Sequence, residues 1–128
     1  MAEITTLTYT PDEIRAMGGD DCFMALPVTI VSSQTALSPG APLGQITASG
    51  KYKLYADANV DGSGVFSGFL CNAVDPAGEG RDVVAAMWVT GYFVNSKVVA
   101  LGFDAAAKAD VAGARVIPGR DILILPGC

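Results

Sequence analysis

The sequence contains no histidine, and charged residues make up only 16% of its 128 residues. Without histidine there is no Ser-His-Asp or Cys-His nucleophile system, no histidine-ligated metal and no imidazole pH switch. Cys22, Cys71 and Cys128 lie far apart and form no C-x-x-C pair. This spacing fits neither a zinc site nor a disulfide scaffold. We interpret them as two reduced, buried thiols and a free one at the C-terminus, in a protein made in a reducing cytosol.

Long hydrophobic runs and an excess of basic charge are also missing. Residues 83–96 carry no charge, but they are fewer than the roughly 20 residues that cross a bilayer. The N-terminus lacks the basic and apolar regions of a signal peptide. Thirteen acidic and eight basic residues give a net charge of −5. An acidic surface repels phosphate backbones and anionic lipids, so we expect neither a nucleic-acid nor a membrane partner.

The residues that are present predict a small folded domain. Hydrophobic residues make up 51% of the chain and its mean hydropathy is +0.41, which excludes disorder over most of its length. We expect one domain with one core. Strands are predicted, from β propensity and turn signals, at residues 28–33, 43–48, 51–55, 65–72, 83–94 and 122–125.

Between these strands the sequence predicts loops and few helices. Residues 57–64 and 75–81 are expected to be polar loops. Short helices are predicted at residues 11–17, with Thr10 as N-cap, and from Ala105 onward, with Asp104 as N-cap and Gly113 as the stop. The predicted fold is therefore α+β and mainly β, with short antiparallel strands, hairpins and one or two short helices.

An extended N-terminal arm with a short helix is expected over residues 1–25, before a β-rich domain over residues 26–128. The arm begins with residues that favour extended backbone, namely Ile4, Thr5, Thr6, Leu7, Thr8, Tyr9 and Thr10. Neither face of this segment is strongly apolar. It is therefore suited to join the sheet edge of another protein. The alternatives are a strand of its own domain or a frayed tail.

Two kinds of chemistry are worth weighing. Asp57-Ala58-Asn59-Val60-Asp61-Gly62 matches the first half of a calcium loop, but its twelfth position is Gly68 instead of Glu. A polar turn loop is the simpler interpretation.

A small carboxylate hydrolase would need two converging acids, one with a raised pKa. The candidates are Asp20, Asp21, Asp57, Asp61, Asp75 and Asp82. A solvated acidic surface explains these acids more simply. We expect no cofactor and no metal.

The remaining signals indicate protein interaction. Trp88, Tyr92 and Phe93 lie in a strand that is apolar on both faces. They are expected to form either the core or a subunit interface, where aromatic anchors carry much of the affinity. Lys51 and Lys53 share one strand face, which favours an exposed hairpin or a protein contact over a nucleic-acid surface.

The order of several segments resembles bacteriophage head decoration proteins of the lambda protein D type. These segments are Val28-Thr29-Ile30-Val31, Leu37-Ser38-Pro39-Gly40, Pro42-Leu43-Gly44, Ile46-Thr47-Ala48-Ser49-Gly50-Lys51-Tyr52, Asp61-Gly62-Ser63, Gly68-Phe69-Leu70, Val89-Thr90-Gly91-Tyr92-Phe93-Val94 and residues 101–110. Together they span roughly residues 26–117.

This resemblance implies a virion structural protein and no enzyme. It implies homotrimers on the outside of an expanded head, at three-fold and quasi-three-fold sites. There they would bind the major capsid protein and stabilise the shell against internal DNA pressure. It also implies an arm that faces the capsid, here Ile4 to Thr10 by position. The chain would be made in the host bacterial cytoplasm. The alternatives are a calcium-dependent carbohydrate-binding or adhesive β module and, less favoured, the carboxylate hydrolase.

Overall fold

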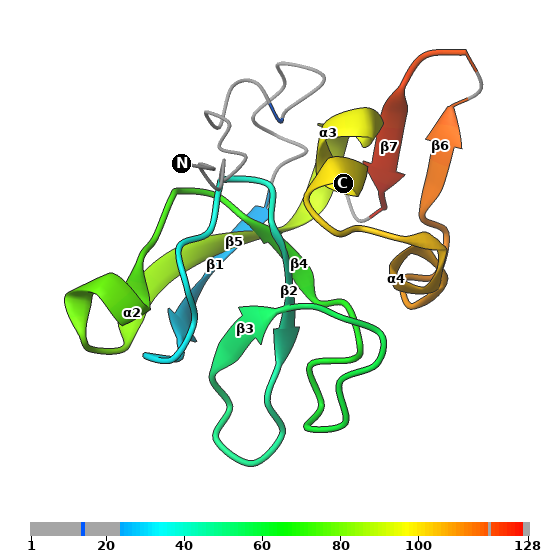
Figure 1. The fold of residues 1–128 in the computed structure, drawn as a ribbon. Coiled ribbons are helices and arrows are strands. Elements are labelled where there is room, and N and C mark those ends of the chain that lie inside the picture. The colour runs from blue at the N-terminus through cyan, green and yellow to red at the C-terminus, as the bar shows by residue number, and fades with distance from the viewer. Residues whose placement is uncertain (1–13, 15–23, 118, 127–128) are drawn as a thin grey trace, which may run out of the picture.

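The computed structural model describes Ile14, residues 24–117 and residues 119–126. This part of the chain contains seven strands and three short helices, whose arrangement is drawn in Figure 1. They are β1 (Met24–Ile30), β2 (Pro42–Gln45), β3 (Tyr52–Leu54), β4 (Gly68–Leu70), α2 (Pro76–Glu79), β5 (Val83–Val94), α3 (Asn95–Ala100), α4 (Ala105–Ala109), β6 (Arg115–Ile117) and β7 (Ile122–Leu125). None of these helices has the length or the apolar character of a membrane span.

Five strands close into a small barrel. The pairing order is β1-β3-β2-β4-β5, and β5 also pairs with β1, which closes the ring. All these pairings are antiparallel except β1 with β3, which are parallel through Ile30 and Tyr52. The long β5 continues past the barrel, where its second half pairs with β7, and β7 pairs with β6. One strand thus joins the barrel to a three-stranded sheet.

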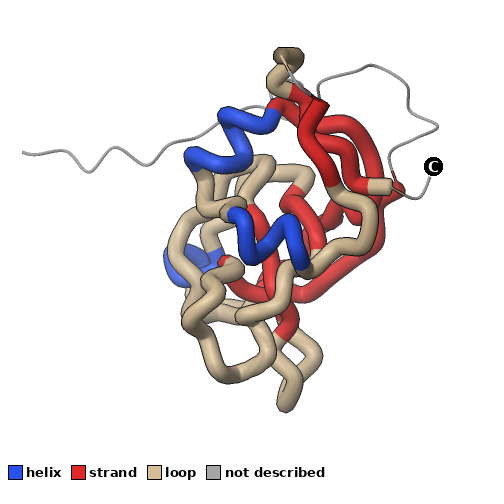
Figure 2. The backbone as a smooth tube through the Cα atoms, turned by 90° about the vertical axis from the view of Figure 1, so that its right-hand side faces the viewer, coloured by secondary structure: helices blue, strands red, loops and turns tan. Residues whose placement is uncertain are grey.

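Two hydrophobic clusters lie on the two faces of β4 and β5, where one core was expected. Alternation along a strand sends successive side chains to opposite faces. Leu70 and Met87 therefore point into the barrel, together with Val28, Ile30, Leu37, Ala41 and Leu43. Phe69 and Trp88 point outward into a second cluster, which α3 and α4 cover. Figure 2 shows the strands gathered on one side of the view and the helices, with the loops, on the other.

Most of the predicted elements are confirmed. The mainly β fold class is correct, and β5 and β7 have the predicted bounds. Helix α4 begins at the predicted residue but ends at Ala109, before the predicted stop at Gly113. Asp104 caps α4, because its side chain accepts a hydrogen bond of 2.8 Å from the Ala107 backbone N–H. The hairpin between β2 and β3 turns at Gly50, which has a φ of +75°. Glycine is favoured there because a Cβ makes this conformation costly.

The prediction of one or two helices was too low. The expected loop at residues 75–81 contains α2, which begins because Pro76 fits the first turn and Asp75 accepts from the Gly78 N–H at 3.0 Å. The chain also enters α3 directly from β5, and no side chain caps that start. The three-residue β6 was not predicted either, since it is specified by its pairing with β7. The short predicted helix lies outside the described residues except for Ile14, whose backbone is helical.

Candidate interaction surface

Trp88 and Phe93, two of the three predicted interface aromatics, lie in the outer hydrophobic cluster. Phe93 has no exposed surface and Trp88 is 7% exposed. The Phe93 ring centroid lies 4.7 Å from that of Phe69 and 5.7 Å from that of Trp88. Both side chains therefore pack within their own chain, which is the core alternative considered for them. Tyr92 is half-buried on β5, and a subunit contact through it stays a prediction.

The predicted arm residues and several other candidates lie outside the described part of the chain. These are Ile4 to Thr10, Asp20, Asp21, Cys22 and Cys128. Cys71, by contrast, is described and buried. The boundary between arm and domain stays a prediction, although β1 begins at Met24, two residues before the expected start of the domain.

The loop of residues 56–65, between β3 and β4, is held by a dense set of hydrogen bonds. Asp61 Oδ1 accepts from the Ser63 backbone N–H at 3.1 Å and from the Ser63 hydroxyl at 2.5 Å. Asn59 Nδ2 donates to that hydroxyl at 2.9 Å, and Ser63 is fully buried. The Asp61 carbonyl accepts from Thr47 N–H at 2.9 Å. The loop is thus fixed to the barrel, while Val60 is completely exposed.

This geometry gives the Asp57–Gly62 motif a structural explanation as a turn loop. Lys53 Nζ lies 3.1 Å from Asp61 Oδ2, so both carboxylate oxygens of Asp61 have partners within the chain. Gly68, at the twelfth position of a calcium loop, is buried in β4. Within the residues that the structure describes, no three Asp, Glu, Cys or His side chains gather as metal ligands. The hydrogen bonds of the turn therefore account for Asn59 and Asp61 of the motif.

Two of the candidate acids, Asp61 and Asp82, are stabilised as anions, whereas a catalytic acid needs a raised pKa. Hydrogen bonds from Ser63 and from Lys53 lower the pKa of Asp61 to about 2. Lys51, whose Nζ lies 2.6 Å from Asp82 Oδ2, and the Ser32 N–H lower the pKa of Asp82. Both predicted lysines therefore have acidic partners, and they form no basic patch. The hydrolase alternative has no support from these two acids.

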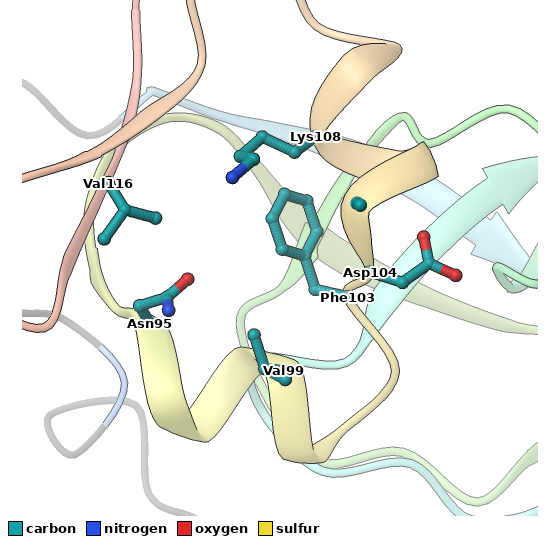
Figure 3. Close-up of a pocket in the computed structure, with 7 residues that line it drawn as sticks. Asn95, Val99, Phe103, Asp104, Lys108 and Val116 are labelled. Atoms are coloured by element: carbon teal, nitrogen blue, oxygen red, sulfur yellow. The ribbon is translucent and has the colours of Figure 1, made fainter.

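A cavity of about 170 Å³ opens between α3, α4 and β6 (Figure 3). Val99, Phe103, Ala105 and Val116 form its apolar lining, and Asn95, Asp104 and Lys108 add polar groups. Phe103 is 2% exposed at the base, whereas Val99 is 50% exposed. No sequence signal identified this site, because its members come from α3, α4, β6 and the loop between the two helices, and only the fold brings them together.

Asp104 connects this cavity to the barrel. The Tyr55 hydroxyl donates to Asp104 Oδ1 at 3.1 Å, and the same oxygen accepts from Ala107 N–H. Tyr55 is 2% exposed. Burial and the hydrogen bond to Asp104 raise the pKa of Tyr55 above its ordinary value of 10.0. A single carboxylate thus orients both the end of β3 and the start of α4.

A family model for bacteriophage lambda head decoration protein D matches residues 8–116. The match includes the whole barrel, both helices that line the cavity and the start of β6. The chain belongs to this family. No curated protein and no solved structure matches the chain.

Membership in the head decoration family confirms the resemblance seen in the sequence. Proteins of this family are structural components of the phage virion that bind the outer surface of the capsid. Head decoration is not an enzyme class. Among the described residues, the carboxylates of Asp61, Asp82 and Asp104 serve as ion-pair partners or as a helix cap.

Proposed function

We propose that this head decoration protein binds the expanded phage head as homotrimers at three-fold and quasi-three-fold sites. There it stabilises the shell against internal DNA pressure through contacts with the major capsid protein. The family match over residues 8–116 carries this proposal. A contact repeated over a whole shell gains avidity from its many copies, so each contact can be weak and no reactive residue is needed.

The fold supports a mechanical role. The barrel is closed, its interior is filled by side chains from all five strands, and the longest strand continues into the second sheet. A closed barrel leaves few open strand edges. The protein is made in the host cytoplasm in this proposal, in agreement with the absence of a disulfide framework in its sequence.

We assign the contact with the capsid to the arm, Ile4 to Thr10. We assign the contacts between the subunits of the trimer to the domain. An extended segment gains affinity from backbone hydrogen bonds when it joins a sheet edge. The segment contains four threonines and one tyrosine among seven residues, a composition that favours extended backbone.

Co-sedimentation with undecorated heads of the parent phage tests the proposal. The full chain should bind expanded heads saturably, in multiples of three per three-fold position, and should not bind unexpanded heads. Loss of residues 1–10 should abolish binding and leave the far-UV circular dichroism spectrum of the domain unchanged. A matched control keeps the arm length and replaces the sequence of residues 4–10 by Gly and Ser. Full binding by the truncated chain would contradict the role of the arm, and no binding by the full chain would contradict the function.

A further inference from the structure

The cavity between α3, α4 and β6 contains two polar side chains without partners in the described part of the chain. Lys108 Nζ makes no ion pair or hydrogen bond there, nor does the side-chain amide of Asn95. Asp104, four residues before Lys108, would be its usual helical partner. Its carboxylate instead holds Ala107 N–H and the Tyr55 hydroxyl. Figure 3 shows that the Asp104 carboxylate points away from the cavity, whereas Lys108 and Asn95 point into it.

The chemistry of this cavity fits an apolar side chain that lies beside a carboxylate. Val99, Phe103 and Val116 supply apolar walls, and the Lys108 ammonium and the Asn95 amide supply hydrogen-bond donors. A cavity of about 150 Å³ accommodates a benzene molecule, so the volume here suits one medium-sized side chain. In a mostly apolar binding site, a small number of polar groups usually fixes the orientation of the bound group. An anionic partner group is favoured because the only formal charge directed into the cavity is positive.

The chain itself presents such a pair of groups. Val60 is a large apolar residue, and its exposed fraction is 100%. Asp57, in the same loop, is exposed and has no ion pair or hydrogen bond within the described residues. The loop is already fixed by Asp61, Ser63 and Asn59, so binding would order few additional bonds and lose little entropy. Because Val60 is completely exposed, it does not occupy the cavity of its own chain.

We propose that the loop of residues 57–60 of one copy docks into this cavity on a second copy. Val60 lies against Phe103 and Val116, and the Asp57 carboxylate binds the Lys108 ammonium. The contact is head-to-tail, since loop and cavity are different surfaces, and such contacts close into rings when the rotation permits. The inference rests on the proposed assembly of several copies on a head and adds the residues through which those copies meet.

Zero-length cross-linking with mixed isotopes tests this contact. Unlabelled and ¹⁵N-labelled full-length chains are mixed, both in concentrated solution and on expanded heads, and treated with a carbodiimide that joins contacting carboxylates and amines. We expect a peptide that links Asp57 of one isotope to Lys108 of the other. Absence of that link from both samples, or a link from Lys108 to a shell carboxylate instead, would overturn the proposal. A link in solution without binding to heads would support this contact and contradict only the proposed function.

Charge reversal provides an independent readout by sedimentation equilibrium. Asp57→Lys and Lys108→Glu should each weaken self-association about tenfold. The double variant D57K/K108E should restore it and give a cross-link between positions 57 and 108 with the groups exchanged. Val60→Ala should also weaken self-association, because it removes the side chain that enters the cavity. The matched control Val84→Ala and the exposed charge reversal Arg120→Glu should leave self-association unchanged. If Asp57→Lys and Lys108→Glu each associate as strongly as Arg120→Glu does, the proposal is overturned.

Discussion

Trp88 and Phe93 lie in the same hydrophobic cluster, with ring centroids 5.7 Å apart, although five positions separate them along β5. Strict alternation would place an even and an odd position on opposite faces. The register of β1 with β5 shifts between Ala25, which pairs with Trp88, and Met24, which pairs with Thr90. The additional residue, Val89, reverses the alternation. One irregularity therefore directs both aromatic side chains to the same core, where the barrel meets the second sheet.

Phe69→Ala should destabilise the protein strongly, because Phe69 is fully buried at the centre of the outer cluster. Its ring lies 4.9 Å from Phe66, 4.7 Å from Phe93 and 5.2 Å from Phe103, between centroids. Removing a buried phenylalanine costs about 3–5 kcal/mol. Urea denaturation measures the loss. Val84→Ala, at a side chain that is 72% exposed, is the control and should change the free energy of unfolding by less than about 0.5 kcal/mol. Equal losses in both variants would contradict the assignment of the core.

Tyr55→Phe should lower the free energy of unfolding by about 1.5–3 kcal/mol, because a hydrogen bond from a buried hydroxyl to a charged group is lost. Asp104→Ala should lower the free energy of unfolding further, since it also removes the cap of α4. Asp104→Asn should lower it less than Asp104→Ala, because the amide retains an acceptor oxygen. A double-mutant cycle with Tyr55→Phe and Asp104→Ala measures the coupling between the two side chains. Simple additivity would show that the contact does not contribute.

The same tyrosine predicts a loss of stability in alkali. The pKa of Tyr55 is raised in the folded protein above its ordinary value of 10.0. The unfolded chain therefore releases this proton at a lower pH than the folded chain, and stability falls as the pH rises above 10. Denaturation curves between pH 8 and pH 11 should show a smaller decline for Tyr55→Phe than for the natural sequence. An identical decline in the two proteins would contradict the raised pKa.

The lowered pKa of Asp61 leads to a loss of stability in acid. Its pKa falls from an ordinary value of 3.8 to about 2 in the folded protein, so its contribution is present above pH 3.8 and is lost as the pH falls through that interval. Asp61→Asn should reduce the pH dependence of stability between pH 4 and pH 2. Asp57→Asn, in the same loop, is the control and should leave that dependence in place. A natural protein with no acid slope in this range would contradict the arrangement around Asp61.

Gly44→Ala should release the loop of residues 56–65 from the barrel. A Cβ at Gly44 would lie 2.3 Å from the Ser63 carbonyl oxygen, and the backbone there has no simple way to yield. We expect a loss of about 1–3 kcal/mol from overpacking and faster hydrogen exchange at the Thr47 N–H, which is bonded to Asp61. Gly80→Ala meets nothing within 4 Å and should not change exchange at Thr47. Unchanged exchange in Gly44→Ala would show that the loop does not depend on this close approach.

Local pattern was sufficient wherever an element is specified by its own residues. The uncharged run of β5 and the aliphatic run of β7 gave correct bounds, and Asp104 with the alanines after it gave the correct start of α4, because propensity and capping act over a few positions. The order of short motifs also indicated the family, which the match over residues 8–116 confirms. The absence of histidine and the scattered cysteines also favour binding over catalysis.

The tertiary structure decided which side of each strand is buried and which distant residues meet. The barrel closes because β5 pairs with β1, and that closure creates two clusters in place of one. The bulge beside Ala25 then places Trp88 and Phe93 in the core, a result that no periodicity reveals since it depends on the register of another strand. The cavity follows the same principle. Asn95, Phe103, Lys108 and Val116 become neighbours only when helices and sheet pack, because packing joins residues that sequence separation keeps apart.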